Sequence, residues 1–346
     1  MKYYLPVAVA ALCFTACSKG SPPLAALDSG SAPTLPSVVA PSSTPSSGPM
    51  ASASPVPDAG AKPCPDDMAY VDVSFCPDVK RECVDEEHEE PNHLLICHKF
   101  KEGVSTCRAQ EEQRRFCIDR YEYPNKAGAH AAWNATWYQA QATCKSKGKR
   151  LCWASEWTAA CEGPERKPFP YGWVRDHDAC NMDNFFIDPI KRDGGFLFSS
   201  KDKAVLLKEL SRLDQSVLSG SLPGCKSGFG VYDQPGNWDE WVISDQAPQE
   251  KSRWAGLKGG AWGHVRNQCR PMTFSHTPDE WYYFWSFRCC KDAEGAPVWK
   301  PSAKNMSAPE VEAHDFFPDP VVPVNPPGPS KTKYGRADRN RPKGTL

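Results

Sequence analysis

Residues 228–241 read Gly-Phe-Gly-Val-Tyr-Asp-Gln-Pro-Gly-Asn-Trp-Asp-Glu-Trp, and this stretch carries the most specific pattern in the chain. It contains a carboxylate at Asp233, a Gly-Asn turn at 236–237 and a second carboxylate at Glu240. Calcium is a hard cation that is bound by several oxygens, which carboxylates supply together with backbone carbonyls exposed at a sharp turn. The pattern therefore indicates a calcium-binding loop or, alternatively, a plain turn with solvated acids.

The residues around this stretch, from 64 to 291, are rich in aromatic residues and glycine and contain few long periodic segments. Two helices are predicted. Thr136 and Gln139 form a capping box before a helix over 137–147, and Gly148 follows as a stop signal. A second helix is predicted over 154–162, ended by Gly163 and Pro164. The rest is predicted to be short strands and long loops.

The composition limits the class of protein. The 346 residues include 41 Lys+Arg and 42 Asp+Glu, so a formal net charge of -1 argues against nucleic acid as a partner. With 40% hydrophobic residues the chain is too apolar to be wholly disordered, and 16 Cys are more than a reducing cytosol usually tolerates. An exported protein is expected.

The two ends are predicted to lie outside the folded domain. Residues 1–16 have the features of an export signal, and the small residue before Cys17 resembles a bacterial lipobox, which implies a lipid anchor on Cys17 in the outer membrane, facing the periplasm or the cell surface. An ordinary signal peptide cut nearby is the alternative. Residues 17–63 are rich in Pro, Ser and Ala and are expected to be a disordered linker, and residues 292–346 a Pro-rich basic tail.

Cysteine arithmetic predicts a disulfide framework. Because Cys13 leaves with the signal and Cys17 is acylated, fourteen cysteines remain, all between Cys64 and Cys290. An even number in an exported domain implies up to seven bridges, whose connectivity cannot be read from spacing alone. Six of them form an even set in a Cys-rich part over 64–117: Cys64, Cys76, Cys83, Cys97, Cys107 and Cys117.

Seven motifs carry a family resemblance, in this order: Phe116-Cys-Ile-Asp-Arg-Tyr-Glu122, Gly148-Lys-Arg-Leu151, Glu156-Trp157, Phe169-Pro-Tyr-Gly172, the stretch 228–241, Lys258-Gly-Gly-Ala-Trp262 and Phe287-Arg-Cys289. Together they resemble the formylglycine-generating enzyme family, also called the sulfatase-modifying factor domain, over residues 64–291 with an insertion over about 183–225. The resemblance implies an α+β fold, a variant of the C-type-lectin-like fold with little regular secondary structure, here rich in disulfides.

The resemblance also implies metal ligands. Carried over onto this chain, one calcium ion is bound by the side chains of Asp233 and Glu240 and the carbonyls of Gly236 and Trp238. A second calcium site begins at Asn181 and the carbonyl of Met182, and the insertion obscures its other ligands.

Disulfide pairs follow from the same resemblance. Cys144 and Cys289 match positions that are bridged in family members. Cys161 matches another bridged position, but its usual partner position is Phe274 here, so Cys161 is expected to pair differently, for example with Cys269. Cys180 and Cys225 flank the insertion and can close its base.

The oxidase members of the family bind copper(I) through two cysteines after a Gly-Gly-Ser-aromatic stretch. Aligning residues 259–262 with that stretch places His264 at the first cysteine and Cys269 at the second. One interpretation is a His/Cys copper site, since imidazole also binds copper. The other is that Cys269 is bridged, which the even number of cysteines supports.

Three functions are consistent with these features. The leading hypothesis is a membrane-anchored lipoprotein that has lost the copper site and binds a peptide, glycan or protein. Under this hypothesis a group of five aromatic residues forms the binding surface: Trp262, Trp281, Tyr282, Tyr283 and Trp285. Packing in the core of the domain would explain these five residues equally well. The alternative is a copper- and oxygen-dependent oxidase that converts a peptidyl Cys to formylglycine in proteins such as sulfatases, with Cys269 and His264 as ligands. A third possibility is a purely structural envelope component.

Overall fold

The computed structural model describes residues 62–89, 94–245, 254–263, 265–301 and 308–318. The predicted signal, Cys17 and most of the linker lie outside these residues, as does His264. No helix among the described residues is both long enough and apolar enough to cross a membrane.

One four-stranded sheet joins the start of the domain to its end. Its strands are β1 (Met68–Phe75), β4 (Glu112–Asp119), β12 (Cys289–Asp292) and β5 (Arg150–Leu151), in the order β1-β4-β12-β5. Burial alternates along β1, as expected for a strand with one face on a core. All three pairings in this sheet are antiparallel.

A second four-stranded sheet carries the residues of the 228–241 stretch. Its order is β10 (Met272–Thr273), β9 (Ala255–Lys258), β8 (Asp239–Ile243) and β11 (Trp285–Phe287). Strands β8 and β11 run parallel, and all five residues of β8 are buried. The second sheet therefore forms the interior of the domain.

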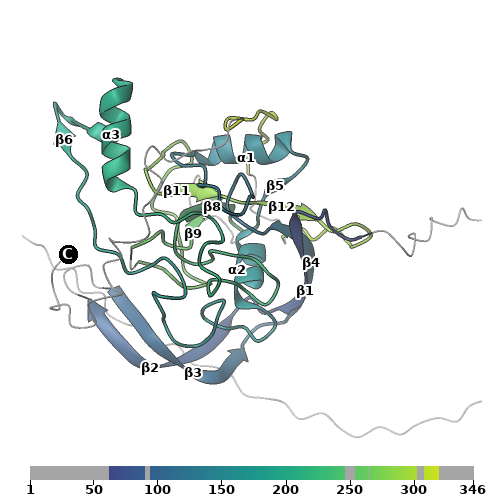
Figure 1. Ribbon diagram of the computed structural model, residues 1–346. Helices are drawn as coiled ribbons and strands as arrows, with labels where there is room; N and C mark the ends of the chain where they lie inside the picture. The colour runs from purple at the N-terminus through teal and green to yellow at the C-terminus, as the bar shows by residue number, and fades with distance from the viewer. Residues whose placement is uncertain (1–61, 90–93, 246–253, 264, 302–307, 319–346) are drawn as a thin grey trace, which may run out of the picture. The chain divides into compact units, whose positions relative to one another are not determined.

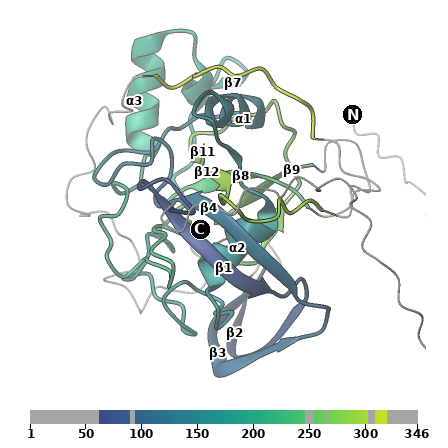
Figure 2. The same ribbon diagram turned by 90° about the vertical axis from the view of Figure 1, so that its right-hand side faces the viewer.

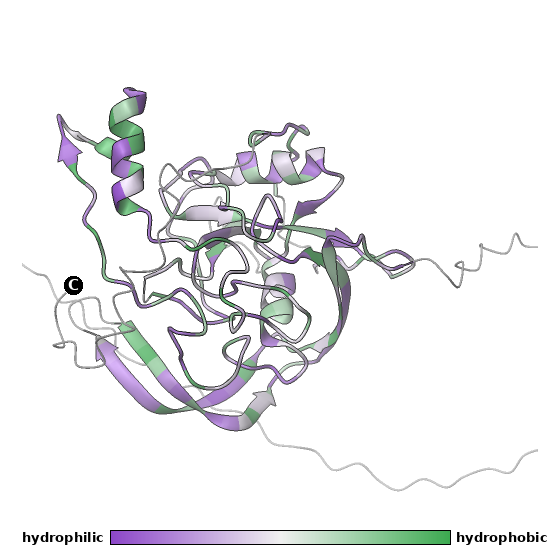
Figure 3. Cartoon of the chain, in the orientation of Figure 1, coloured by the Kyte–Doolittle hydropathy of each residue, from purple (hydrophilic) through white to green (hydrophobic). Residues whose placement is uncertain are grey.

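Two further strand pairs lie outside these sheets. Strands β2 (Val79–Glu89) and β3 (Leu94–Cys107) form a long antiparallel pair with register shifts, and β2 is largely hydrophilic (Figures 1 and 3). The predicted insertion contains β6 (Lys191–Arg192), β7 (Gly195–Phe196), the 3-10 helix η1 (Leu197–Ser199) and α3 (Lys203–Leu213). Neither α3 nor the strand pair in the insertion was predicted.

Both predicted helices are confirmed. Helix α1 (Trp137–Ser146) begins after Thr136, whose side chain accepts from the backbone N–H of Gln139 while the Gln139 side chain accepts from that of Thr136. Helix α2 (Ala154–Glu162) ends at Gly163, where φ is 67°. All nine residues of α2 are buried, and the helix lies beside β1 and β4 (Figures 1 and 2).

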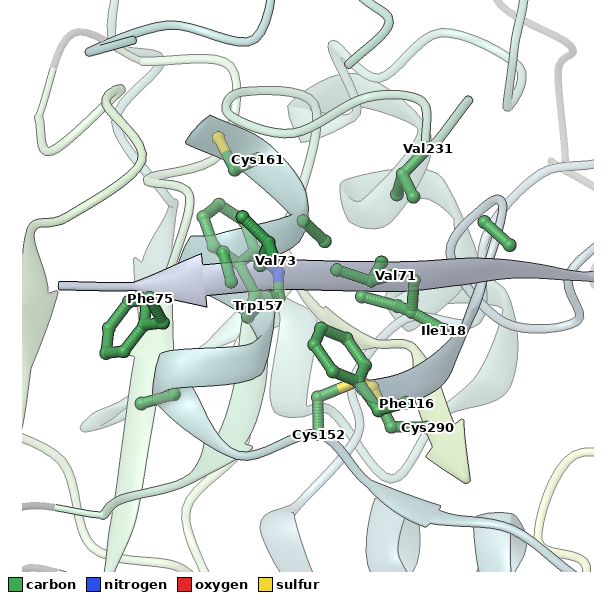
Figure 4. Close-up of a cluster of buried hydrophobic side chains, with 14 of the residues drawn as sticks. Val71, Val73, Phe75, Phe116, Ile118, Cys152, Trp157, Cys161, Val231 and Cys290 are labelled. Atoms are coloured by element: carbon green, nitrogen blue, oxygen red, sulfur yellow. A yellow bond between two sulfur atoms is a disulfide. The ribbon is translucent and has the colours of Figure 1, made fainter. Parts of the chain in front are cut away.

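The core between α2 and the first sheet centres on Trp157. Figure 4 shows its ring beside Val73 of β1, with Val71 further along that strand and Phe116 and Ile118 of β4 in the same cluster. The Cys152–Cys290 disulfide closes one side of this core. Burying such a cluster is the main source of stability that a fold with short strands can have.

All fourteen cysteines from Cys64 to Cys290 are paired. The Cys-rich part is internally bridged, by Cys64–Cys117, Cys76–Cys107 and Cys83–Cys97. The other four bridges are Cys144–Cys289, Cys152–Cys290, Cys161–Cys269 and Cys180–Cys225. The sequence analysis proposed no partners for Cys152 and Cys290.

The tail over 292–346 was predicted to be disordered, and the structure differs from this prediction in the first part of the tail. Residues 308–318 lie against the domain: the backbone N–H of His314 donates to the carbonyl of Ala142 at 3.2 Å, and Phe317 packs near Tyr123 and Phe287. The proline content that favours disorder does not prevent a short segment from covering exposed aromatic rings. Residues 319–346 lie outside the described part of the chain.

Candidate functional site

The turn in the 228–241 stretch requires unusual backbone conformations. Asp233, Gly236 and Asn237 all have positive φ, at 62°, 92° and 56°. A side chain at Gly236 would place its Cβ 2.6 Å from the carbonyl oxygen of Asn181, so only glycine fits. The backbone N–H of Asn237 donates to that same carbonyl at 2.8 Å, which holds the turn against the start of the insertion.

Glu240 points into the interior and is fully engaged there. Its carboxylate accepts two hydrogen bonds from Arg288, from Nε and Nη2 at 2.7 Å each, and one from the indole N–H of Trp157 at 2.9 Å. Both Glu240 and Arg288 are 1% exposed. The geometry is that of a bidentate buried ion pair, in which both carboxylate oxygens are occupied.

Two more carboxylates are buried close to this pair. Asp233 accepts from the backbone N–H of Gly220 at 2.7 Å, and Glu122 accepts from the hydroxyl of Ser219 at 2.8 Å and the amide of Asn237 at 2.9 Å. Burial, followed by the charge of Glu122, holds the pKa of Asp233 well above its usual value, and burial likewise raises the pKa of Glu122. Glu122 ends a motif quoted above, but its role was not predicted.

Oxygens that the resemblance assigned to calcium already accept hydrogen bonds in this arrangement. Both Glu240 oxygens accept from Arg288, and the Gly236 carbonyl accepts from the backbone N–H of Trp238 at 2.7 Å. At the second site, the Asn181 side chain donates to the Gln215 carbonyl and the Asn237 amide and accepts from Asn184. Met182 is buried beside Cys180 and Cys225. Within the described residues, no group of three or more His, Cys, Asp or Glu side chains is arranged to hold a metal.

The donor set assigned to copper does not fit that metal. Cys269 is 0% exposed and bonded to Cys161, so it offers no thiolate, and His264 lies outside the described residues. This bridge is the alternative partner that the sequence analysis named for Cys161. The structure also joins Cys144 to Cys289 and Cys180 to Cys225, the pairs that the sequence analysis suggested.

A pocket of about 230 Å³ lies beside the Gly-Gly-Ala-Trp stretch. Asn267 holds the loop of this stretch, because its side-chain amide donates to the carbonyls of Gly259, Gly260 and Ala261 at 2.7–3.2 Å. A Cβ at Gly260 would lie 1.8 Å from the carbonyl oxygen of Val265, so the loop can close only with glycine there. Most of the pocket is apolar or aromatic, lined by Phe185, Phe186, Ala261, Trp262, Val265, Tyr283 and Phe284.

A buried ion pair supplies charge at this pocket. Asp239 is 1% exposed, accepts from the backbone N–H of Gly260 at 3.0 Å and pairs with Arg266, which is also in the pocket wall. Burial raises the pKa of Asp239, and Arg266 opposes that rise. His276 completes the polar side. The sequence analysis singled out none of these three residues.

The aromatic group proposed as a binding surface is mainly core. Trp262, Tyr283 and Trp285 are 4%, 3% and 2% exposed, whereas Trp281 and Tyr282 are half-buried. Trp262 packs edge-on against Trp238, with ring centroids 5.3 Å apart. Trp281 and Tyr282 keep more exposed surface, and of the five residues Trp262 and Tyr283 line the pocket.

A family model described as the sulfatase-modifying factor enzyme 1-like domain matches residues 81–293. The match covers more than half of the chain, so the protein belongs to this family, and both the resemblance and the fold class are confirmed. Among solved structures, the chain is similar to CarF, with 13% identity and a TM-score of 0.41 over 66% of this chain and 98% of CarF. It is also similar to PvdO from Pseudomonas aeruginosa, with 17% identity and a TM-score of 0.36 over 65% and 92% of the two chains.

Proposed function

We propose that this protein is an envelope-anchored lipoprotein whose sulfatase-modifying-factor domain acts as a binding module and not as a copper-dependent oxidase. The observation that carries the proposal is the Cys161–Cys269 disulfide, which removes the thiolate that copper chemistry needs. The seven bridges support an exported location. The lipid on Cys17 is the proposed membrane anchor.

The proposed binding site is the pocket beside Ala261 and Trp262. Its volume of about 230 Å³ is smaller than the roughly 300–1,000 Å³ of ordinary small-molecule pockets. It suits one apolar or aromatic side chain of a partner polypeptide, with the Asp239–Arg266 pair at the edge to receive a backbone group. The partner is therefore proposed to be a peptide or protein.

A thiol count separates a binding module from an oxidase. The chain is denatured without reductant, alkylated and mapped, and copper(I) binding is measured on the native chain. We expect no alkylated cysteine between 64 and 290 and no stoichiometric copper. Cys161→Ala is the matched control, because it frees Cys269 and is expected to give one alkylated site. A reactive Cys269 and tight copper binding in the unmodified chain would support the oxidase instead.

Peptide selection tests the pocket itself. Peptides from a random library are enriched on the oxidised chain and then bound to Gly263→Phe. A Cβ at Gly263 meets no atom within 4 Å, and the residue lines the pocket, so a Phe side chain there is expected to occupy the site. Gly195→Phe is the control, since it is equally unobstructed but lies in β7. Loss of binding in Gly263→Phe alone is expected; equal binding by both variants would contradict the proposed site.

A further inference from the structure

A second, larger cavity of about 640 Å³ lies where the end of β1, strand β4, the first turn of α2 and the end of β9 meet. Phe75, labelled at the end of β1 in Figure 4, forms part of its wall, and Trp299 forms another. It shares no lining residue with the pocket beside Ala261. Its volume falls within the range of about 300–1,000 Å³ that is typical of small-molecule sites.

Arg114 is the unusual residue in this cavity. It stands opposite Val73 in the β1–β4 register, at a core position of β4, and is 2% exposed. Its Nη2 pairs with Glu112 at 3.0 Å, and its guanidinium lies 3.3 Å from the centroid of the Trp299 ring. In the described part of the chain, its Nε and Nη1 have no hydrogen-bond partner.

Unpartnered buried donors are costly, so they point to a group that completes them. A guanidinium has five N–H donors and no acceptor, and leaving buried donors unsatisfied costs more than an average hydrogen bond contributes. Ser155 adds a buried hydroxyl in the same wall that likewise lacks a partner among the described residues. Two side chains from different elements that line one cavity therefore carry donors that lack a partner among the described residues.

The charge around the cavity limits what the ligand can carry. Four basic side chains line it, namely Arg114, Lys258, Arg270 and Lys300, against three acidic ones, Asp78, Glu112 and Asp245. Arg270 is already paired with Glu162, at 2.6 and 2.8 Å, and Lys258 donates to the carbonyl of Arg270 at 2.9 Å. The lining thus has only one more basic than acidic side chain, which favours a ligand with at most one negative charge.

We propose that this cavity binds a small organic molecule through a single carboxylate. Arg114 and Ser155 donate to the carboxylate oxygens, and the ligand's carbon skeleton packs on Trp299, Phe75 and Met272. The assignment is separate from the peptide pocket proposed above and stands or falls independently of it.

Three probes that share a phenyl ring and differ in charge test the charge requirement. Benzoate, its neutral isostere benzamide and the dianion phenyl phosphate are titrated into the oxidised full chain by calorimetry at constant ionic strength. We expect saturable binding of benzoate and at least tenfold weaker binding of the other two. Absence of saturable benzoate binding, or tighter binding of phenyl phosphate, would overturn the proposal.

Variants then place the binding at Arg114. Arg114→Met is expected to weaken benzoate binding on the order of tenfold to a hundredfold, because hydrogen bonds from a charged donor are lost. Arg115→Met is the matched control: its side chain is the next one on β4 but is 45% exposed and pairs with Asp72. Unchanged affinity in a folded Arg114→Met chain would refute the site.

Ser155→Ala keeps the test decisive if Arg114→Met does not fold. Ser155 lies in the first turn of α2, where its backbone N–H donates to Asp245 at 3.1 Å, and this contact does not need the hydroxyl. The variant is expected to fold normally and to bind benzoate several-fold more weakly. Affinity equal to that of the unmodified chain would then overturn the proposal.

Discussion

At the scale of single residues, the interior is organised around Arg288. This guanidinium pairs with Glu240 through two hydrogen bonds and also donates to the carbonyl of Tyr232 at 3.0 Å. Glu122 and Asp233 are buried beside the pair, so one cation faces three carboxylates. The sequence indicated that the acids of the 228–241 stretch are important, but it could not show that Arg288, far along the chain, pairs with Glu240.

Asp233→Asn is expected to stabilise the protein at neutral pH. Burial raises the pKa of Asp233 in the folded state, so the folded state holds a proton that the unfolded state releases above about pH 4. The stability that this proton provides is complete below the unfolded pKa of 3.8 and is lost as pH rises through the folded pKa. The neutral Asn side chain can still accept the hydrogen bond from the backbone N–H of Gly220. Because this side chain does not titrate, the variant does not lose that stability as pH rises. Urea unfolding should show about 1 kcal/mol or more of added stability at pH 7, with a shallower fall in stability above pH 4.

The same variant distinguishes a buried carboxyl at Asp233 from a calcium ligand at this position. A calcium ligand replaced by an amide would lower stability, and a chelator would lower the melting temperature of the unmodified chain. Asp72→Asn, at a half-exposed ion pair with Arg115, is the control and should change stability by no more than about 0.5 kcal/mol. A loss of stability in Asp233→Asn would contradict the interpretation of Asp233 as a buried carboxyl beside the Glu240–Arg288 ion pair.

At the scale of elements, the sequence predicted what local chemistry determines. Both helices of the body were located from their caps, because a capping box and a glycine stop act within a few residues. The strands were not located, since most have two to five residues and their burial depends on partners distant in sequence. Helix α3 lies in the insertion, whose residues match no family motif. The segment 308–318 was missed for a related reason: its prolines indicate disorder, and the aromatic surface that it covers is formed only in the fold.

Phe317→Ala is expected to destabilise the domain by about 1–2 kcal/mol. The ring of Phe317 lies 5.7 Å from that of Phe287 and 6.3 Å from that of Tyr123, so its removal uncovers two core aromatics. Denaturant unfolding measures the change. Phe316→Ala is the neighbouring control, because Phe316 is 45% exposed and should change stability little. Equal effects of the two substitutions would mean that the segment does not pack as described.

At the scale of the whole molecule, disulfides take the place of long strands and helices. The even number of cysteines predicted that all fourteen are paired. It could not predict which cysteines pair with each other, because that depends on the directions in which the strands point their side chains. Cys289 and Cys290 are adjacent in β12 and so point to opposite faces, where one meets Cys144 of α1 and the other Cys152. Two bridges thereby join nearly the same segments of the chain. The third long-range bridge, Cys161–Cys269, lies nested within them.

The Cys144–Cys289 and Cys152–Cys290 bridges overlap along the chain, and they should stabilise the fold non-additively. While Cys152–Cys290 is intact, opening Cys144–Cys289 releases only a short loop, and the converse also holds, although the bridges span 138 and 145 residues. Removing both frees a longer loop, so the loss of stability in the double-bridge variant should exceed the sum of the single losses by about 1 kcal/mol. Replacing each pair by alanines and comparing the unfolding free energies gives this coupling, since the cavity left by each pair cancels in the cycle. The Cys83–Cys97 bridge spans 14 residues between β2 and β3 and serves as the control pair, because its removal should add independently to that of Cys144–Cys289. Full additivity of the two overlapping bridges would show that loop closure is not how they stabilise the domain.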